Sequence, residues 1–281
     1  MSQASIAASY GLYYASPPQA GDGSIESTWI TRSANVVVAV SQVRAGALLA
    51  RQDNPDEYML LLPPGVRAEV TAGDASITAG ADSLTIVPPG ASSVRVLDAG
   101  AITRVFSVRA VDLAGLASNA QHYAAGAPSV APLEDWPMPV GGYRLRHYEL
   151  AKFLDPKLFG RLFRSRNLMI NVFERKDERR DPAKLSPHSH GDFEQISLAM
   201  EGSFIHHLRT PWGPDSNQWK DDEHVEVHSP STIVIPTNLV HTTQATGKGV
   251  NWLIDIFGPP RRDFSSQAGL VRNEDEYPMP G

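Results

Sequence analysis

The chain has 281 residues, of which 42% are hydrophobic and 20% charged, and its formal net charge is −6. This composition is typical of a globular protein with one large or two modest domains, and it contains no basic stripe for nucleic acid. The absence of cysteine excludes disulfides and thiolate metal sites, so any metal must be held by nitrogen and oxygen ligands. Residues 1–16 lack the features of a signal peptide, and no apolar run approaches the length of a membrane span. We therefore expect a cytoplasmic protein.

The first half contains short β-type runs separated by turn-forming residues. After a Ser-, Ala-, Gly- and Pro-rich arm at residues 1–27, these runs lie at residues 35–43, 58–62, 68–71, 83–87, 93–97 and 102–108. Turns such as Pro63-Pro64-Gly65 separate them, and no segment has a sustained helical period. We predict that this half is all-β.

The middle of the chain changes composition and indicates a connector. Residues 111–150 are first rich in Ala, Gly and Ser and then in Pro. A short helix is predicted over residues 154–163, with Asp155 as its cap and Pro156 in its first turn. Residues 167–174 then form the opening strand of a second β region.

The histidines are concentrated in this second region, because seven of the nine lie between His188 and His241. His188 and His190 are one residue apart, and side chains in a strand repeat every two residues, so both imidazoles lie on one face. Glu194 and Gln195 follow, and a tight turn further on delivers His241. Three imidazoles and one oxygen donor on neighbouring strands are a typical ligand set for a borderline divalent metal.

These two segments together resemble the cupin superfamily. The matching positions are His188-x-His190, Gln195, Gly202 and Pro236-x-Asn238-x-x-His241. The turn glycine of the family is Asn238 here, which is tolerable because Asn also adopts positive φ readily. The glycines that open each family motif are replaced by Pro182 and Pro230. The resemblance implies a jelly-roll β-barrel that holds one divalent metal through His188, His190, Gln195 and His241, with Glu194 as the alternative to Gln195.

An internal repeat indicates a second barrel. Residues 51–58 match residues 188–195 at an offset of 137, which also places Gly65 on Gly202. Residues 88–93 then match residues 236–241, and the ligand positions hold Arg51, Asp53, Glu57 or Tyr58, and Ser93. Because no imidazole remains there, the first half is similar to the degenerate barrel of a bicupin. We predict two tandem cupin barrels: residues 1–125 without metal ligands, and residues 126–281 with the connector and the metal site.

The fourth ligand has two adjacent candidates, only one of which can face the metal. If Gln195 points into the barrel, the small Ser197 and Ala199 do so too, which leaves room for a substrate. If Glu194 points inward, larger apolar side chains fill the barrel instead. Gln195 leaves the site with the full charge of the metal, which favours anionic, chelating substrates.

Two further histidines are candidate catalytic residues. His206 and His207 follow Gly202 on the next predicted strand, and alternation places one of them inward. The inward residue is expected to act as an acid or base, or as a partner of a metal ligand. His224 and His228 are expected on the surface.

The resemblance implies a metal-dependent enzyme that acts on a small anionic organic substrate. We favour Fe(II)-dependent, dioxygenase-type oxidation, with Mn, Ni or Zn as other possible metals. The alternatives are isomerase or lyase chemistry on a sugar acid or 2-oxo acid, and metabolite binding without catalysis. We expect no nucleic-acid or membrane partner. We expect the protein to form a homodimer.

Overall fold

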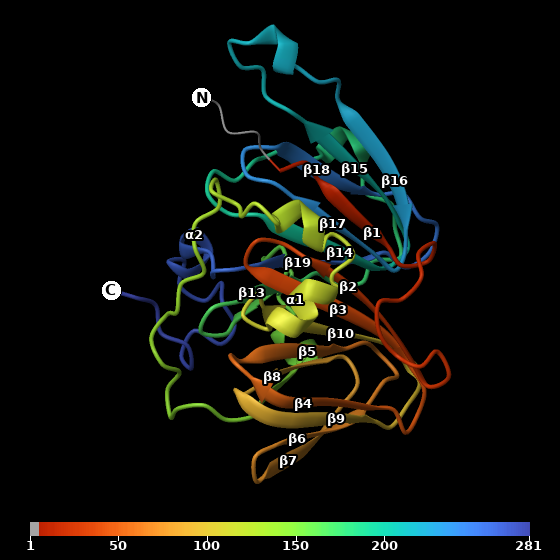
Figure 1. Cartoon of the computed structure of the whole chain (residues 1–281), viewed down its shortest axis with the longest axis vertical. Helices are drawn as coiled ribbons and strands as arrows, with labels where there is room; N and C mark the ends of the chain where they lie inside the picture. The colour runs from red at the N-terminus through yellow and green to blue at the C-terminus, as the bar shows by residue number, and fades with distance from the viewer. Residues whose placement is uncertain (1–5) are drawn as a thin grey trace.

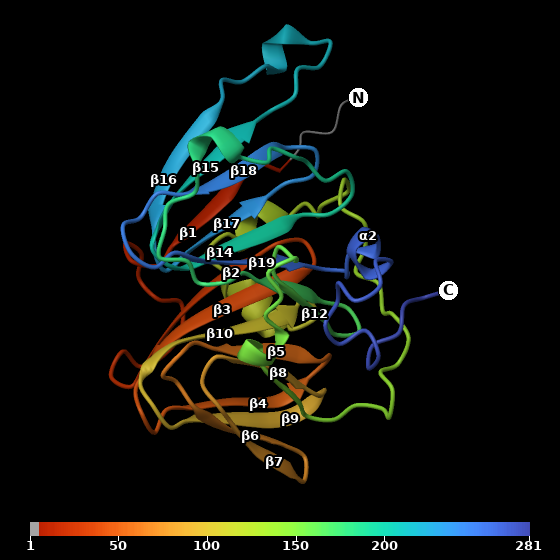
Figure 2. The same ribbon diagram turned by 180° about the vertical axis from the view of Figure 1, so that it is seen from behind.

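The computed structural model describes residues 6–281, and two barrels of β-strands make up most of it (Figures 1 and 2). Helical segments in this range are short. They are the α-helices α1 (Val111–Leu116) and α2 (Arg262–Ser265) and the 3₁₀ turns η1 (Ala120–Tyr123), η2 (Leu150–Phe153), η3 (Pro182–Lys184) and η4 (Ser216–Gln218). No helix of the described residues is long and apolar enough to cross a membrane. The chain therefore has the all-β, two-barrel architecture that the sequence predicts.

The first barrel is built from a six-stranded and a four-stranded sheet. The six-stranded sheet has the order β11-β8-β5-β10-β3-β2, and the four-stranded sheet has the order β4-β9-β6-β7. The bounds are β2 (Glu26–Arg32), β3 (Val36–Val43), β4 (Leu48–Asn54), β5 (Tyr58–Leu62), β6 (Ala68–Ala72), β7 (Ala75–Ala79), β8 (Ser83–Val87), β9 (Gly90–Val96), β10 (Gly100–Ser107) and β11 (Arg146–Glu149).

The second barrel has a six-stranded and a three-stranded sheet. Their orders are β1-β17-β14-β19-β13-β12 and β16-β15-β18. The bounds are β1 (Ser9–Leu12), β12 (Arg161–Arg164), β13 (Met169–Val172), β14 (Gln195–Glu201), β15 (Ser203–Arg209), β16 (Glu223–His228), β17 (Ser231–Ile235), β18 (Val240–Ala245) and β19 (Trp252–Phe257). The hairpin of β15 and β16 projects from the body of the molecule (Figure 1).

Two strands cross between the halves of the sequence. β1 comes from the N-terminal arm but pairs with β17 of the second barrel, with Ser9 opposite Val234. β11 comes from the connector but pairs with β8 of the first barrel, with Arg146 opposite Ile86. Each barrel therefore covers one edge of its large sheet with a strand from the other half, which protects otherwise unpaired N–H and C=O groups.

The two large sheets pack face to face and enclose the main core between the barrels (Figure 2). Because alternate residues of a strand face opposite sides, β14 directs Ile196, Leu198 and Met200 into this core. Met59 and Leu61 of β5 meet them from the first barrel. Burial of each such side chain contributes roughly 1.5–3 kcal/mol, so the sandwich strongly fixes which face of β14 turns into its own barrel.

The predicted turns have the backbone expected of them. Asn238 has a φ of 63°, and Gly90, its counterpart in the first barrel, has a φ of 97°. Gly65 and Gly202, which the repeat also aligns, have φ values of 85° and 94°. The tolerance of Asn238 for positive φ is confirmed, and the repeat extends to the turns.

The helix predicted over residues 154–163 is wrong. Arg161–Arg164 form strand β12, which pairs with β13, and the Asp155 side chain accepts a hydrogen bond from the backbone of Lys157 in a turn (3.0 Å). Phe163 lies in the core between the two sheets. Tertiary pairing at the open edge of β13 therefore overrides the local capping pattern.

Candidate metal centre

A short antiparallel bridge brings the histidines together. The backbone N–H of His188 donates to the carbonyl of His241 (3.0 Å), and the N–H of His241 donates back to the carbonyl of His188 (2.8 Å). His190 joins them from the same extended segment, with its ring centroid 5.0 Å from that of His188 and 5.2 Å from that of His241. One candidate ligand atom from each of the three rings lies within 4.8 Å of the others.

Backbone carbonyls determine which ring nitrogens are available. Nδ1 of His188 lies 2.9 Å from the carbonyl oxygen of Ser186, and Nδ1 of His241 lies 2.9 Å from that of Leu239. A carbonyl only accepts, so each Nδ1 carries a proton, and in the neutral imidazole Nε2 is then the nitrogen with the free lone pair. Nε2 of His241 is buried and has no hydrogen-bond partner within residues 6–281. Such a nitrogen is suited to bind a metal.

Burial keeps two of these imidazoles neutral. The pKa of His190 is lowered to about 3 and that of His241 to about 4, mainly by desolvation and to a smaller extent by the nearby positive charge of Arg261. Both rings are therefore unprotonated at neutral pH, which is the form that coordinates metals.

Gln195 lies beside the histidine cluster, next to His190. Its Oε1 lies 3.0 Å from Nε2 of His190, and its Nε2 donates to the hydroxyl of Ser197 (2.9 Å). Two ligands at about 2.0–2.1 Å from one metal at right angles would stand about 3 Å apart, so this spacing fits a shared ion. Three neutral nitrogens and one amide oxygen form a donor set that suits a divalent transition metal.

Glu194 points the other way. Its carboxylate accepts hydrogen bonds from the backbone N–H of Ala34 (2.7 Å) and from the hydroxyl of Tyr123 (3.1 Å), both of the first half. The register of β14, fixed by the core between the sheets, turns Gln195 toward the histidines and Glu194 away. Ser197, on the same face as Gln195, is fully buried behind it and hydrogen-bonds to Gln195 and Asp255.

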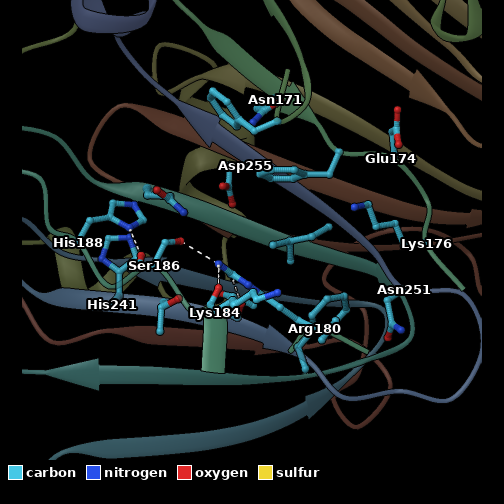
Figure 3. Close-up of a pocket in the computed structure, with 18 of the residues that line it drawn as sticks. Asn171, Glu174, Lys176, Arg180, Lys184, Ser186, His188, His241, Asn251 and Asp255 are labelled. Atoms are coloured by element: carbon cyan, nitrogen blue, oxygen red, sulfur yellow. Dashed lines mark hydrogen bonds between the residues drawn. The ribbon is translucent and has the colours of Figure 1, made fainter. Parts of the chain in front are cut away.

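A cavity of about 990 Å³ opens from this cluster. His188 and His241 lie at one end of it, and Lys176 and Asn251 lie at the other, with Asp255 between (Figure 3). The wall is mixed. Its aromatic members are Phe159, Phe173, Phe204, Phe257 and Phe264, and its basic members are Lys176, Arg179, Arg180, Lys184 and Arg261. Its acidic members are Glu174, Glu178, Asp181 and Asp255, so the wall combines apolar surface with charges of both signs.

Comparison with known proteins identifies the architecture. No family model and no curated protein matches the chain. The solved oxalate decarboxylase of Lactobacillus farciminis, in complex with formate, has a TM-score of 0.60 at 11% identity, over 90% of this chain and 86% of that one. A variant of the Bacillus subtilis oxalate decarboxylase has a TM-score of 0.57 at 9% identity, over 89% and 77%. The chain has the bicupin fold.

A third similar structure is that of protein Ylba from E. coli. Its TM-score is 0.57 at 10% identity, over 90% of this chain and 91% of that one. At this level of identity the likeness concerns the fold. What the second cupin barrel binds must therefore be argued from its own residues.

The two candidate catalytic histidines lie on opposite faces of β15. His206 is buried, and its Nδ1 lies 2.9 Å from the hydroxyl of Thr243; desolvation lowers its pKa to about 4. His207 faces outward, where its ring meets that of His224 (Nδ1 to Nδ1, 2.8 Å). Neither residue is among those that line the cavity. His206 can support the site only from behind Thr243, and His207 lies outside the barrel.

Asp255 is a residue of the site that the sequence reasoning missed. It is the acidic residue in the otherwise apolar strand Trp252–Phe257, and it accepts a hydrogen bond from the hydroxyl of Ser197 (2.6 Å). Burial raises its pKa to about 6. An acidic side chain in the middle of an apolar strand was the available signal, because such a group is seldom buried without a function.

Proposed function

We propose that the second barrel is a metal-dependent enzyme site for a small anionic organic substrate. The observation that carries this proposal is the cluster of three histidines, two with Nδ1 hydrogen-bonded to carbonyls, at the end of a large cavity. His188, His190, Gln195 and His241 would hold the metal. A divalent metal there would polarise a chelating substrate, and Fe(II) would add the capacity for oxygen chemistry.

Dioxygenase-type oxidation is the reaction that we propose first. Four neutral donors leave the charge of the metal uncompensated, so an anionic substrate is attracted to it. Arg261 adds positive charge at the cavity wall, although Asp263 pairs with its guanidinium (2.6 Å). Phe159 and Phe173 provide an apolar surface for the body of the substrate. The volume and this apolar wall support an acid with an aromatic or aliphatic body.

A non-oxidative lyase or isomerase reaction is the second candidate, and Asp255 favours it. Its carboxyl group lines the cavity and is hydrogen-bonded to Ser197, where it could donate or accept a proton on a bound substrate. Two of the similar structures are oxalate decarboxylases, which adds support for chemistry on a carboxylic acid.

A substrate screen with and without air tests both candidates. The protein purified without added metal should contain close to one divalent metal per chain, and metal analysis should identify it. Product that requires both metal and oxygen supports the oxidation, whereas product without oxygen that disappears in Asp255→Asn supports the second candidate. Tight binding of an acid with no turnover under either condition would instead indicate a binding protein. The expected homodimer can be measured in the same preparation by sedimentation.

A further inference from the structure

Two sequence motifs recur in both halves outside the metal-ligand pattern. Residues 32–35 read R-S-A-N and residues 164–167 read R-S-R-N. Residues 114–123 read A-G-L-A-S-N-A-Q-H-Y and residues 268–277 read A-G-L-V-R-N-E-D-E-Y. The first motif forms the turns between β2 and β3 and between β12 and β13, and the second motif follows β10 and β19. Such a repeat indicates one structural unit used twice.

Within each barrel, the asparagine of the second motif forms hydrogen bonds with the turn made by the first motif. Oδ1 of Asn119 accepts from the backbone N–H of Arg32 (3.0 Å), and its Nδ2 donates to the carbonyl of Arg32 (2.8 Å). Asn273 makes the same two bonds to Arg164, also at 3.0 and 2.8 Å. The turn and the following segment therefore form one rigid piece in each half.

Each of these pieces donates hydrogen bonds to a buried glutamate of the other barrel. Glu194 of the second half accepts from the backbone N–H of Ala34 (2.7 Å) and from the hydroxyl of Tyr123 (3.1 and 3.2 Å). Glu57 of the first half accepts from the backbone N–H of Arg166 (3.2 Å) and from the hydroxyl of Tyr277 (2.7 Å). The two glutamates are only 3% and 1% exposed, so water cannot replace these donors.

The arrangement is reciprocal, but only one of its two copies adjoins the candidate metal centre. The internal repeat aligns Glu57 with Glu194, and each stands just before the strand that turns its next residue into its own barrel. That next residue is Tyr58 in the first barrel and Gln195 in the second. Glu194 thus anchors the start of β14 between His190 and Gln195, while Glu57 anchors an equivalent strand that has no ligand.

We propose that Glu194 and Tyr123 are positioning residues of the metal centre, through which the metal-free barrel holds the ligand strand of the other barrel. The inference rests on the proposed function. Neither residue contacts the metal ligands by its side chain; the hydrogen bonds of Glu194 fix the backbone from which Gln195 projects. Without these hydrogen bonds, the backbone before Gln195 no longer fixes the distance of 3.0 Å between its Oε1 and Nε2 of His190.

The two copies provide a matched pair of variants. Tyr123→Phe and Tyr277→Phe each remove one buried hydroxyl that donates to a buried glutamate, so both should lower the unfolding temperature of the metal-free protein by similar amounts. Co²⁺ is the probe, added to metal-free full-length protein, and its affinity and visible absorption spectrum are measured. Tyr123→Phe should weaken Co²⁺ binding about tenfold, as losing a supporting contact around metal ligands often does, and change the spectrum at saturation. Tyr277→Phe should stay within about twofold of wild type with an unchanged spectrum.

Glu194 variants extend the test if Tyr123→Phe folds poorly. Glu194→Gln keeps an acceptor for the N–H of Ala34 and should retain more of the Co²⁺ affinity than Glu194→Ala, which loses both bonds. Equal Co²⁺ affinity and equal spectra in the two tyrosine variants, or wild-type affinity and spectrum in both glutamate variants, would overturn the positioning role while leaving the metal site intact. A wild-type protein that binds no Co²⁺ would overturn the proposed function and this inference with it.

Discussion

At equivalent positions the two barrels contain side chains of very different size. Tyr58, Leu60 and Leu62 point into the first barrel, and the repeat aligns them with Gln195, Ser197 and Ala199 of the second. The first set belongs to a continuous apolar core. Of the second set, Gln195 lines the cavity, Ser197 is hydrogen-bonded to it, and Ala199 packs in a small apolar cluster with Phe204 and Val227. One strand frame therefore supports a packed core in one barrel and a polar cavity in the other.

The mouth of the first barrel is also closed. Arg51, at the position of His188, forms two hydrogen bonds with Asp112 of α1 (2.6 and 3.0 Å). The ring of Tyr58 stacks on Phe106 at 4.8 Å, and Ala114 of α1 packs into the same core. Among the described residues, the histidine cluster of the second barrel is the group found with metal-ligand spacing. The first barrel is filled where the second is open, and this packing avoids the cost of an empty apolar cavity.

The largest expected effect is the loss of metal binding when a histidine of the second barrel is replaced. His241→Ala should reduce metal affinity by more than about 100-fold, since it removes a ligand rather than a supporting contact, for which losses of about 10–100-fold are typical. Arg51→Ala, in the first barrel, should leave the metal content unchanged. Metal analysis after dialysis of both variants measures this. Metal retained at wild-type level in His241→Ala would show that the histidine cluster is not the site.

The next prediction compares substitutions at two aligned positions, one of which should lower stability and the other metal affinity. Tyr58→Ala should destabilise the protein by about 3–5 kcal/mol because it opens a cavity in a packed core, and it should leave metal affinity intact. Gln195→Ala should lower metal affinity about tenfold or more and change the unfolding free energy far less, since Gln195 borders an existing cavity. Urea unfolding of metal-free protein and a metal titration measure the two quantities. The same ranking of both variants in both assays would contradict the contrast between the barrels.

The metal pattern was visible in the sequence because its chemistry needs particular residues at particular spacings. His188, His190 and His241 are brought together as that pattern requires. Strand alternation also indicated the face of Gln195, because the small Ser197 shares it. The fourth ligand itself remains a prediction, since it depends on a bound metal.

Other features depend on contacts that one half of the sequence cannot reveal. The exchange of β1 between barrels needs the open edge of β17, and β12 forms where a helix was predicted because β13 offers an edge. Asp255 could have been found as an acid in an apolar strand. The A-G-L-x-x-N-x-x-x-Y repeat was also readable, but its role appears only when Tyr123 meets Glu194 across the two barrels.

A smaller effect concerns the charge at the fourth ligand. Gln195→Glu should keep the metal, because a carboxylate oxygen can replace the amide oxygen as a ligand. It should lower the affinity for an anionic substrate, because it adds a negative charge beside the metal. A binding titration with the acid found in the substrate screen measures this, with Glu201→Gln, on the exposed end of β14, as a control. Unchanged affinity for the acid in Gln195→Glu would indicate that Gln195 does not face the metal.

The smallest expected effect tests the feature that the barrels share, the buried glutamate. Desolvation raises the pKa of Glu57 above its ordinary value of 4.5, although Tyr277, the backbone of Arg166 and the charge of Arg146 act in the opposite direction. A carboxyl group whose pKa is higher in the folded state contributes stability that is fully present below pH 4.5 and is lost as the pH rises through the folded-state pKa. Glu57→Gln cannot ionise, so its unfolding free energy should fall less steeply than that of wild type between pH 4.5 and neutrality. Urea unfolding of metal-free protein across this range measures the two slopes. Parallel slopes would mean that Glu57 ionises as easily in the folded chain as in the unfolded one, and that its burial is offset in full by Arg146 and the two hydrogen-bond donors.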